Sequence, residues 1–201
     1  ISQSTAITCV KPSGTVSQLV NAASGIHARH NDYYIRRVRG DKKDPLTKFL
    51  QEQNIPIEDC VMKPEATSVF SFVESAPKGC LVRNQRTAIE QLEHWLIYAQ
   101  YWCEHKPSIT ISVNEDEWLG VADWCWNNFN DLSGVSFLPT SGHVYQQAPY
   151  ENIDNETYNK LKSKQPNKIN WNELIEYEQD DNTKSSQTLA CTANSCEVVD
   201  V

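Results

Sequence analysis

The first feature that could do chemistry is a loop of small, hydroxyl-bearing residues near the start of the chain, Lys11-Pro12-Ser13-Gly14-Thr15-Val16-Ser17. β-favouring residues precede it and apolar residues at helical spacing follow it, which predicts a strand, a tight loop and the start of a helix. A helix N-terminus offers unpaired N–H groups and the positive end of the helix dipole, and a glycine lets a ligand approach the backbone. The predicted phosphate-binding residues are therefore Pro12, Ser13, Gly14, Thr15, Val16 and Ser17. An ordinary strand-to-helix turn fits the residues equally well, and the spacing is not that of a Walker loop.

The second feature is a pair of cysteines near the other end, Cys191 and Cys196, with four residues between them. They follow a polar stretch, residues 179–188, whose composition is typical of a linker. Two thiols on such a segment can close a labile disulfide and exchange it with other sites, which predicts a redox-active dithiol. Half of a zinc site is a poorer interpretation because no second Cys or His pair lies nearby, while two bystander thiols remain an open alternative.

The remaining cysteines and the histidines predict no further site. Five cysteines stand singly at 9, 60, 80, 103 and 125, and buried reduced thiols are the expected state for such residues. His27 and His30 lie three apart, but no carboxylate or thiolate completes a ligand set, so a structural role in a loop is expected. No metal site is predicted.

Composition limits the partners. The 201 residues carry a net charge of −8, which argues against a general nucleic-acid surface, although Arg29 to Lys43 form a local basic cluster. No apolar run is long enough to cross a membrane, and no signal peptide is present, so a cytoplasmic location is expected. The chain starts on Ile1 rather than Met, which suggests a fragment.

The hydrophobic pattern alternates between strand and helix. Strands are predicted near 5–10, 33–39, 67–73, 108–113 and 134–138, and helices near 16–23, 45–53, 87–103 and 114–129, with a short helix near 171–178. The helix that starts after Thr87 has a capping-box pattern, because Glu90 follows three residues later. Alternating strands and helices are typical of an α/β sheet or barrel with mostly parallel strands.

Several motifs in combination resemble one enzyme family. They are Thr8-Cys9-Val10 with the loop at 11–17, Ser24-Gly25-Ile26-His27, residues 34–39, Ile89-Glu90-Gln91-Leu92, residues 108–113 with Glu117-Trp118, residues 134–139, Ala148-Pro149-Tyr150-Glu151, Leu189-Ala190-Cys191 and Cys196-Glu197. This set resembles the adenosylcobalamin-dependent (class II) ribonucleotide reductases, with the triphosphate-reductase branch the nearest match. The resemblance covers nearly the whole chain.

The resemblance implies a fold and a division of labour. Residues 1–165 would form the C-terminal part of a ten-stranded α/β barrel, and residues 166–201 a flexible tail. The loop at 12–17 would hold the phosphates of a ribonucleoside triphosphate. Cys191 and Cys196 would reduce the active-site disulfide formed in each turnover, and thioredoxin or a similar donor would then reduce them.

The resemblance also implies what the chain lacks. The family's radical cysteine lies in an N-P-C-x-E-like loop, and no such spacing occurs here; Asn194-Ser195-Cys196-Glu197 has its Glu one residue early. A complete catalyst would therefore need the rest of the reductase chain. That complete enzyme would hold adenosylcobalamin, with residues 25–39 as a candidate contact region. Two alternatives stay open at this point: an independent nucleotide-binding module without catalysis, and a free-standing thiol carrier.

Overall fold

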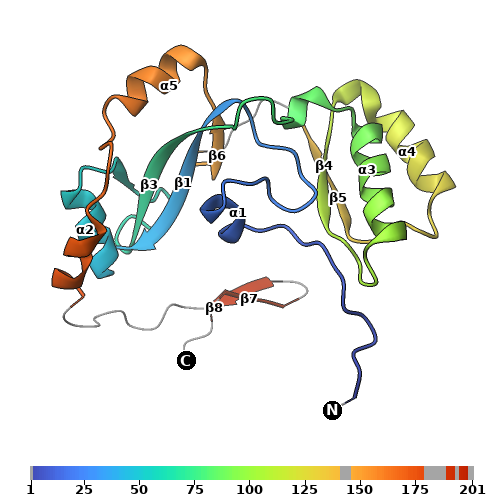
Figure 1. The fold of residues 1–201 in the computed structure, drawn as a ribbon, viewed down its shortest axis with the longest axis horizontal. Coiled ribbons are helices and arrows are strands. Elements are labelled where there is room, and N and C mark those ends of the chain that lie inside the picture. The colour runs from blue at the N-terminus through green and yellow to red at the C-terminus, as the bar shows by residue number, and fades with distance from the viewer. Residues whose placement is uncertain (1, 141–145, 179–188, 193–194, 199–201) are drawn as a thin grey trace. The chain divides into compact units, whose positions relative to one another are not determined.

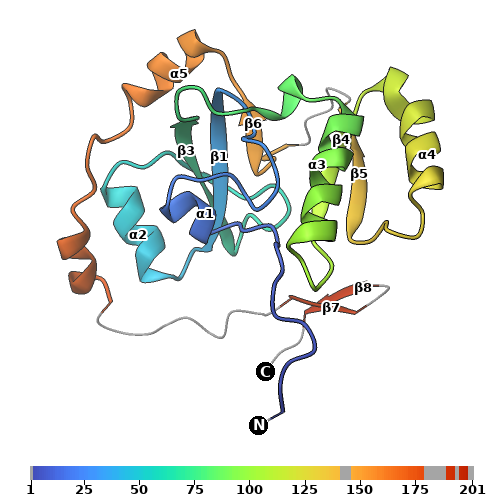
Figure 2. The same ribbon diagram turned by 45° about the vertical axis from the view of Figure 1, so that its right-hand side comes forward.

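The computed structural model describes residues 2–140, 146–178, 189–192 and 195–198, the last two ranges by their backbone only (Figures 1 and 2). The chain divides into two compact units. The first unit comprises Ile1–Tyr34 and Ser75–Val144, and the second comprises Ile35–Glu74 and Tyr145–Val201. Each unit is thus built from two separate stretches of sequence.

The first unit is organised around a parallel strand pair, β4 (Ile109–Val113) and β5 (Val135–Pro139), with Ile109 opposite Val135. Helix α3 (Ala88–Tyr101) packs on β4, and α4 (Trp118–Asn127) packs on α3. Short helical turns lie at α1 (Val16–Leu19), η1 (Arg83–Gln85) and η2 (Glu115–Glu117). The buried core side chains come from these elements: Ala88, Leu92, Trp95, Ile109, Ile111, Val113 and Val121, together with Ile26.

Helix α3 starts where the sequence predicts it. The Thr87 side chain accepts a hydrogen bond from the Glu90 amide at 3.2 Å, and the Glu90 carboxylate accepts one from the Thr87 amide at 2.8 Å. These two bonds satisfy N–H groups that have no partner within the helix. The bond from the Thr87 amide, and a second one from the Thr87 hydroxyl, lower the pKa of the Glu90 carboxyl below its usual value. The predicted capping box is confirmed.

The second unit contains most of a four-stranded sheet with strand order β2-β3-β1-β6. The strands are β1 (Tyr33–Asp41), β2 (Ile57–Asp59), β3 (Thr67–Ser75) and β6 (Tyr150–Asn152). Helix α2 (Pro45–Glu52) begins on the Asp44 cap, and α5 (Asn155–Lys162) begins on the Asp154 cap. The turn η3 (Trp171–Glu176) packs on α2, and Phe49 and Phe70 lie in the core between sheet and helix.

The prediction of mostly parallel strands is wrong for this sheet. β2 and β3 are antiparallel. The Ala76 amide donates to the Asp32 carbonyl and the Lys42 amide to the Ala66 carbonyl, so β1 and β3 also run in opposite directions. Periodicity identifies a strand but does not fix its partner, and the short link between β2 and β3 favours an antiparallel pair. The chain is therefore a mixed α/β protein.

Other boundaries also differ from the prediction. Residues 5–10 form no strand, although the Thr8 and Val10 carbonyls accept hydrogen bonds from His105 and Ser108. Helix α1 is one turn long because Asn21 adopts a positive φ of 50°. The strands β2 and β6 and the helix α5 were not predicted; at 3 residues, each strand is too short to show a period.

The start of the predicted tail packs against the second unit. Ile169, Leu174 and Tyr177 contact the core cluster that contains Phe49. The Tyr177 hydroxyl donates to the Glu52 carboxylate at 2.6 Å. The predicted linker at 179–188 lies outside the described residues. Beyond it, β7 (Leu189–Thr192) and β8 (Ser195–Val198) pair as antiparallel strands.

Candidate phosphate loop and dithiol

The loop at 12–17 is held by its own hydroxyl groups. The Ser17 side chain is buried, and its Oγ donates to the Ser13 carbonyl at 2.6 Å. The Ser13 Oγ accepts from the Ser17 amide at 3.1 Å. Two of the three predicted hydroxyl groups therefore shape the loop.

Thr15 and Val16 present the groups that remain available to a ligand. Thr15 stands at the N-cap of α1, and its side chain makes no capping hydrogen bond. Both residues are exposed, and within the described part of the chain no acceptor is found for either backbone amide. Around Gly14, a built Cβ would meet no atom within 4 Å, so the space in front of the loop is open. Two amides and a hydroxyl at such a position suit a phosphate group.

A second layer of residues supports the loop from behind. The Ser13 amide donates to the Ser24 Oγ at 2.8 Å. Gly25 has a φ of +61°, and a Cβ there would lie 2.8 Å from the Lys11 carbonyl oxygen. Only glycine combines this backbone conformation with so close an approach. Residues 24 and 25 thus fix the position at which the loop leaves Lys11.

His27 connects this second layer to strand β4. Its Nδ1 lies 2.8 Å from the Ser24 carbonyl, and its Nε2 accepts a hydrogen bond from the Thr110 amide at 2.9 Å. These two contacts give His27 the structural role in a loop that the sequence predicts. Its support of the loop was not predicted, although Ser24-Gly25-Ile26-His27 was one of the motifs quoted for the resemblance.

The two tail cysteines are register partners. β7 and β8 place Cys191 directly opposite Cys196, with Ala190 opposite Glu197. Directly opposed residues of antiparallel strands have Cα atoms about 4.5–5.5 Å apart. A disulfide requires a Cα separation of about 4.4–6.8 Å, so this register is compatible with one. The five other cysteines are free thiols.

The fold and the loop together define a class of protein. A crystal structure of a B12-dependent (class II) ribonucleotide reductase matches 85% of this chain with a TM-score of 0.71 and 28% sequence identity. The match spans 24% of that enzyme's chain. This chain therefore shares its fold and a detectable part of its sequence with a segment of a ribonucleotide reductase.

Curated relatives specify the branch. An adenosylcobalamin-dependent ribonucleoside-triphosphate reductase of Euglena gracilis is 33% identical over 79% of this chain. A probable enzyme of the same name from Dictyostelium discoideum is 35% identical over 77%. The reductase of Lactobacillus gasseri is 27% identical over 95% of the chain, so that likeness reaches into residues 166–201. The resemblance to this family is confirmed, and it favours a reductase segment over an independent nucleotide-binding module.

The likeness has a defined extent. The chain spans 22% and 21% of the lengths of the Euglena and Dictyostelium relatives. No family model matches it. In the described part of the chain, no helix is long and apolar enough to cross a membrane.

Proposed function

We propose that this chain forms the C-terminal part of an adenosylcobalamin-dependent ribonucleoside-triphosphate reductase, which converts ribonucleoside triphosphates to 2′-deoxyribonucleotides by radical chemistry. Residues 1–165 would contribute to a ten-stranded α/β barrel, and 166–201 would form the C-terminal tail, whose first residues pack on the second unit. The names of the relatives support the reaction, and the architecture of the phosphate loop supports this segment's part in it. The complete enzyme would act in the cytoplasm.

The loop at 12–17 would bind the substrate phosphates. The observation that carries this proposal is that Thr15 and Val16 are exposed and that no acceptor for their backbone amides is found among the described residues. The neighbouring Gly14 has no atom within 4 Å of the position that a Cβ would take. Phosphate oxygens would accept from these amides and from the Thr15 hydroxyl. Ser13 and Ser17 would act by holding the loop in shape.

The tail would carry electrons to the active site. A thiolate of Cys191 or Cys196 would attack one sulfur of the active-site disulfide, which breaks the S–S bond, releases the other sulfur as a thiol and forms a mixed disulfide. The second tail thiol would then attack the tail sulfur of the mixed disulfide and release the remaining active-site sulfur as a thiol. The products are a tail disulfide and two active-site thiols. Thioredoxin or a similar dithiol would return two electrons and two protons to the tail. The direct opposition of the two cysteines in β7 and β8 supports this proposal.

The reductase needs more than this chain. Adenosylcobalamin, the cofactor in the names of the relatives, would be held by the complete enzyme, where it starts the radical chemistry. Residues 25–39 stay a predicted contact region. The close approach of Gly25 to Lys11 and the hydrogen bonds of His27 are explained by the loop they support. The radical cysteine would come from the rest of the reductase chain.

Substitution of Thr15 tests the phosphate loop. Thr15→Val removes the hydroxyl group and keeps the shape, so the full-length protein should bind a nucleoside triphosphate about ten-fold more weakly with unchanged thermal stability. Thr5→Val, at an exposed threonine outside the loop, is the matched control. If calorimetry gave the two variants equal affinities for ATP, the Thr15 hydroxyl group would not be part of the phosphate site.

A further inference from the structure

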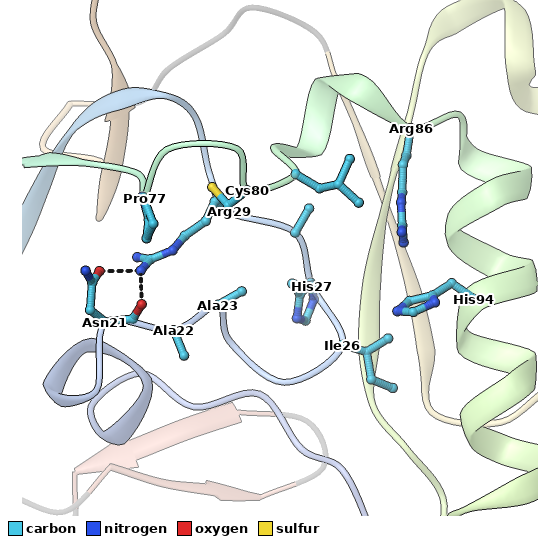
Figure 3. A pocket seen from close by; sticks show the side chains of 12 residues that line it. Asn21, Ala22, Ala23, Ile26, His27, Arg29, Pro77, Cys80, Arg86 and His94 are labelled. Carbon is cyan, nitrogen blue, oxygen red and sulfur yellow. Dashed lines mark hydrogen bonds between the residues drawn. The ribbon is translucent and has the colours of Figure 1, made fainter.

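The first unit contains a cavity of about 300 Å³ that none of the residues 12–17 lines (Figure 3). Its walls come from residues 21–29 and 77–81 and from Arg86 and His94. The volume is at the lower end of the range for small-molecule sites. The cavity therefore suits a small ligand or one group of a larger ligand.

The charged and titratable lining residues give the cavity a basic character. Arg29, Arg86, His27 and His94 all contribute to its wall, and no Asp or Glu does. Figure 3 shows the Arg86 guanidinium directed toward the His94 ring. Arg29 lies on the opposite wall, beside Asn21. Such a distribution of charge favours an anion.

Arg29 provides a buried charge with neutral partners. The residue is 6% exposed. Its guanidinium donates to the Tyr34 hydroxyl at 3.2 Å and to the carbonyl and side-chain oxygens of Asn21. Among the described residues, no carboxylate lies within ion-pair distance of it. A buried charge without a counter-charge is unfavourable, and an anion in the cavity would compensate it.

Arg86 and His94 lie in the wall of the same cavity, on the side away from Arg29. Both are half-buried, and the Arg86 guanidinium donates no hydrogen bond to the described residues. Burial, and then the positive charge of Arg86, lower the pKa of His94. Without an anion, these effects favour the neutral form of the His94 imidazole. A bound anion would favour the protonated form. The planar fork of donors on Arg86 matches a tetrahedral oxyanion.

We propose that this cavity is a binding site for a phosphate group, held by Arg86 and His94 and neutralising Arg29. The group is either free inorganic phosphate or the terminal phosphate of a nucleotide. The proposal does not depend on the loop at 12–17, because no residue of that loop lines the cavity.

The test is calorimetry on the full-length protein, with sulfate and inorganic phosphate as probes. Wild type should bind both anions. Arg86→Gln should lower the affinity for each anion about ten-fold or more, because charge-assisted hydrogen bonds are lost. Arg86→Lys should recover part of the affinity. Arg83→Gln removes the same charge from a nearby half-buried arginine that does not line the cavity, and it should bind as wild type does. Thermal melts of all variants separate a lost site from a lost fold.

A second arm distinguishes the two sources of phosphate. If ATP displaces sulfate, and Arg86→Gln lowers the affinity for ATP by the same factor as the affinity for sulfate, the ligand is a nucleotide phosphate. If ATP leaves sulfate in place, the ligand is the free anion. The proposal is overturned if wild type binds neither probe, or if Arg86→Gln and Arg83→Gln bind them equally.

Discussion

The imidazole of His27 joins two backbone groups that lie far apart in the sequence: its Nε2 accepts from the Thr110 amide at 2.9 Å, and its Nδ1 lies 2.8 Å from the Ser24 carbonyl. These partners assign the neutral tautomer with hydrogen on Nδ1. The Ser24 hydroxyl oxygen in turn accepts a hydrogen bond from the Ser13 amide. The position of the phosphate loop is thus fixed from β4 through one side chain.

Replacement of His27 tests this connection. His27→Phe leaves the Thr110 amide without its partner and removes the ring contact to the Ser24 carbonyl, which still accepts from the amide of residue 27. It should therefore lower the free energy of unfolding by about 1–3 kcal/mol, because a backbone N–H loses its hydrogen bond. His27→Gln retains a donor and an acceptor and should recover part of the loss. Urea denaturation measures the stabilities, and ATP calorimetry measures the effect on the loop. The connection is unimportant if both variants unfold at the wild-type urea concentration.

Replacement by alanine should affect stability differently at two glycines of the same region. Gly25→Ala places a methyl group 2.8 Å from the Lys11 carbonyl oxygen at a φ of +61°, and a destabilisation of at least about 1–3 kcal/mol is expected. Gly14→Ala meets open space, so the free energy of unfolding should stay within about 1 kcal/mol of wild type. A bulkier residue 14 should nevertheless weaken the binding of ATP, because the proposed phosphate site lies there. Thermal melts that shift equally for both variants would contradict this distinction.

Local features of the sequence predicted the elements but not their partners. α3 and β4 were predictable because a capping box and a clear hydrophobic period lie within a few residues of each other. The direction of the β2–β3 pair, the approach of Gly25 to Lys11 and the link from His27 to Thr110 are contacts between separate segments, which no local pattern contains. The phosphate loop was predicted from its residue types. That assignment stays a prediction, and only the coordinates show that the Ser13 and Ser17 hydroxyl groups form hydrogen bonds within the loop.

The contact between Tyr177 and Glu52 predicts a dependence of stability on pH. The hydrogen bond to Glu52 is the main reason that the pKa of Tyr177 rises from 10.0 to about 12. A raised pKa in the folded state means that this contribution to stability is complete below pH 10 and is lost as the pH rises toward about 12. Tyr177→Phe should abolish that part of the alkaline loss. Urea midpoints at several pH values provide the measurement, and parallel curves for wild type and Tyr177→Phe would refute the assignment.

Anion binding in the cavity of the first unit should take up a proton. His94 shares the cavity wall with Arg86, Arg29, His27 and Cys80. On its own helix its ring contacts Tyr98, and Glu90, one turn earlier, interacts with the charge of Arg86. Burial and Arg86 lower the pKa of the empty His94, and a bound anion would raise it. Affinity for sulfate should therefore increase as the pH falls through the anion-bound pKa and level off below the pKa of the empty site. Sulfate itself does not titrate in this range.

Calorimetry in two buffers of different ionisation enthalpy measures the proton uptake directly. His94→Gln should bind sulfate more weakly and with a smaller pH dependence. An unchanged pH dependence in His94→Gln would show that His94 does not take up the proton.

The register of Cys191 and Cys196 predicts how the tail should fail. In the full-length enzyme, Cys191→Ser or Cys196→Ser should abolish turnover with thioredoxin, because neither variant can form the tail disulfide. Turnover with a small dithiol should survive, since such a reagent reaches the active-site disulfide without the tail. Ser195→Ala, beside Cys196 and without a thiol change, is the matched control and should be active with both reductants. Equal activity of a cysteine variant with both reductants would exclude these thiols from the electron path.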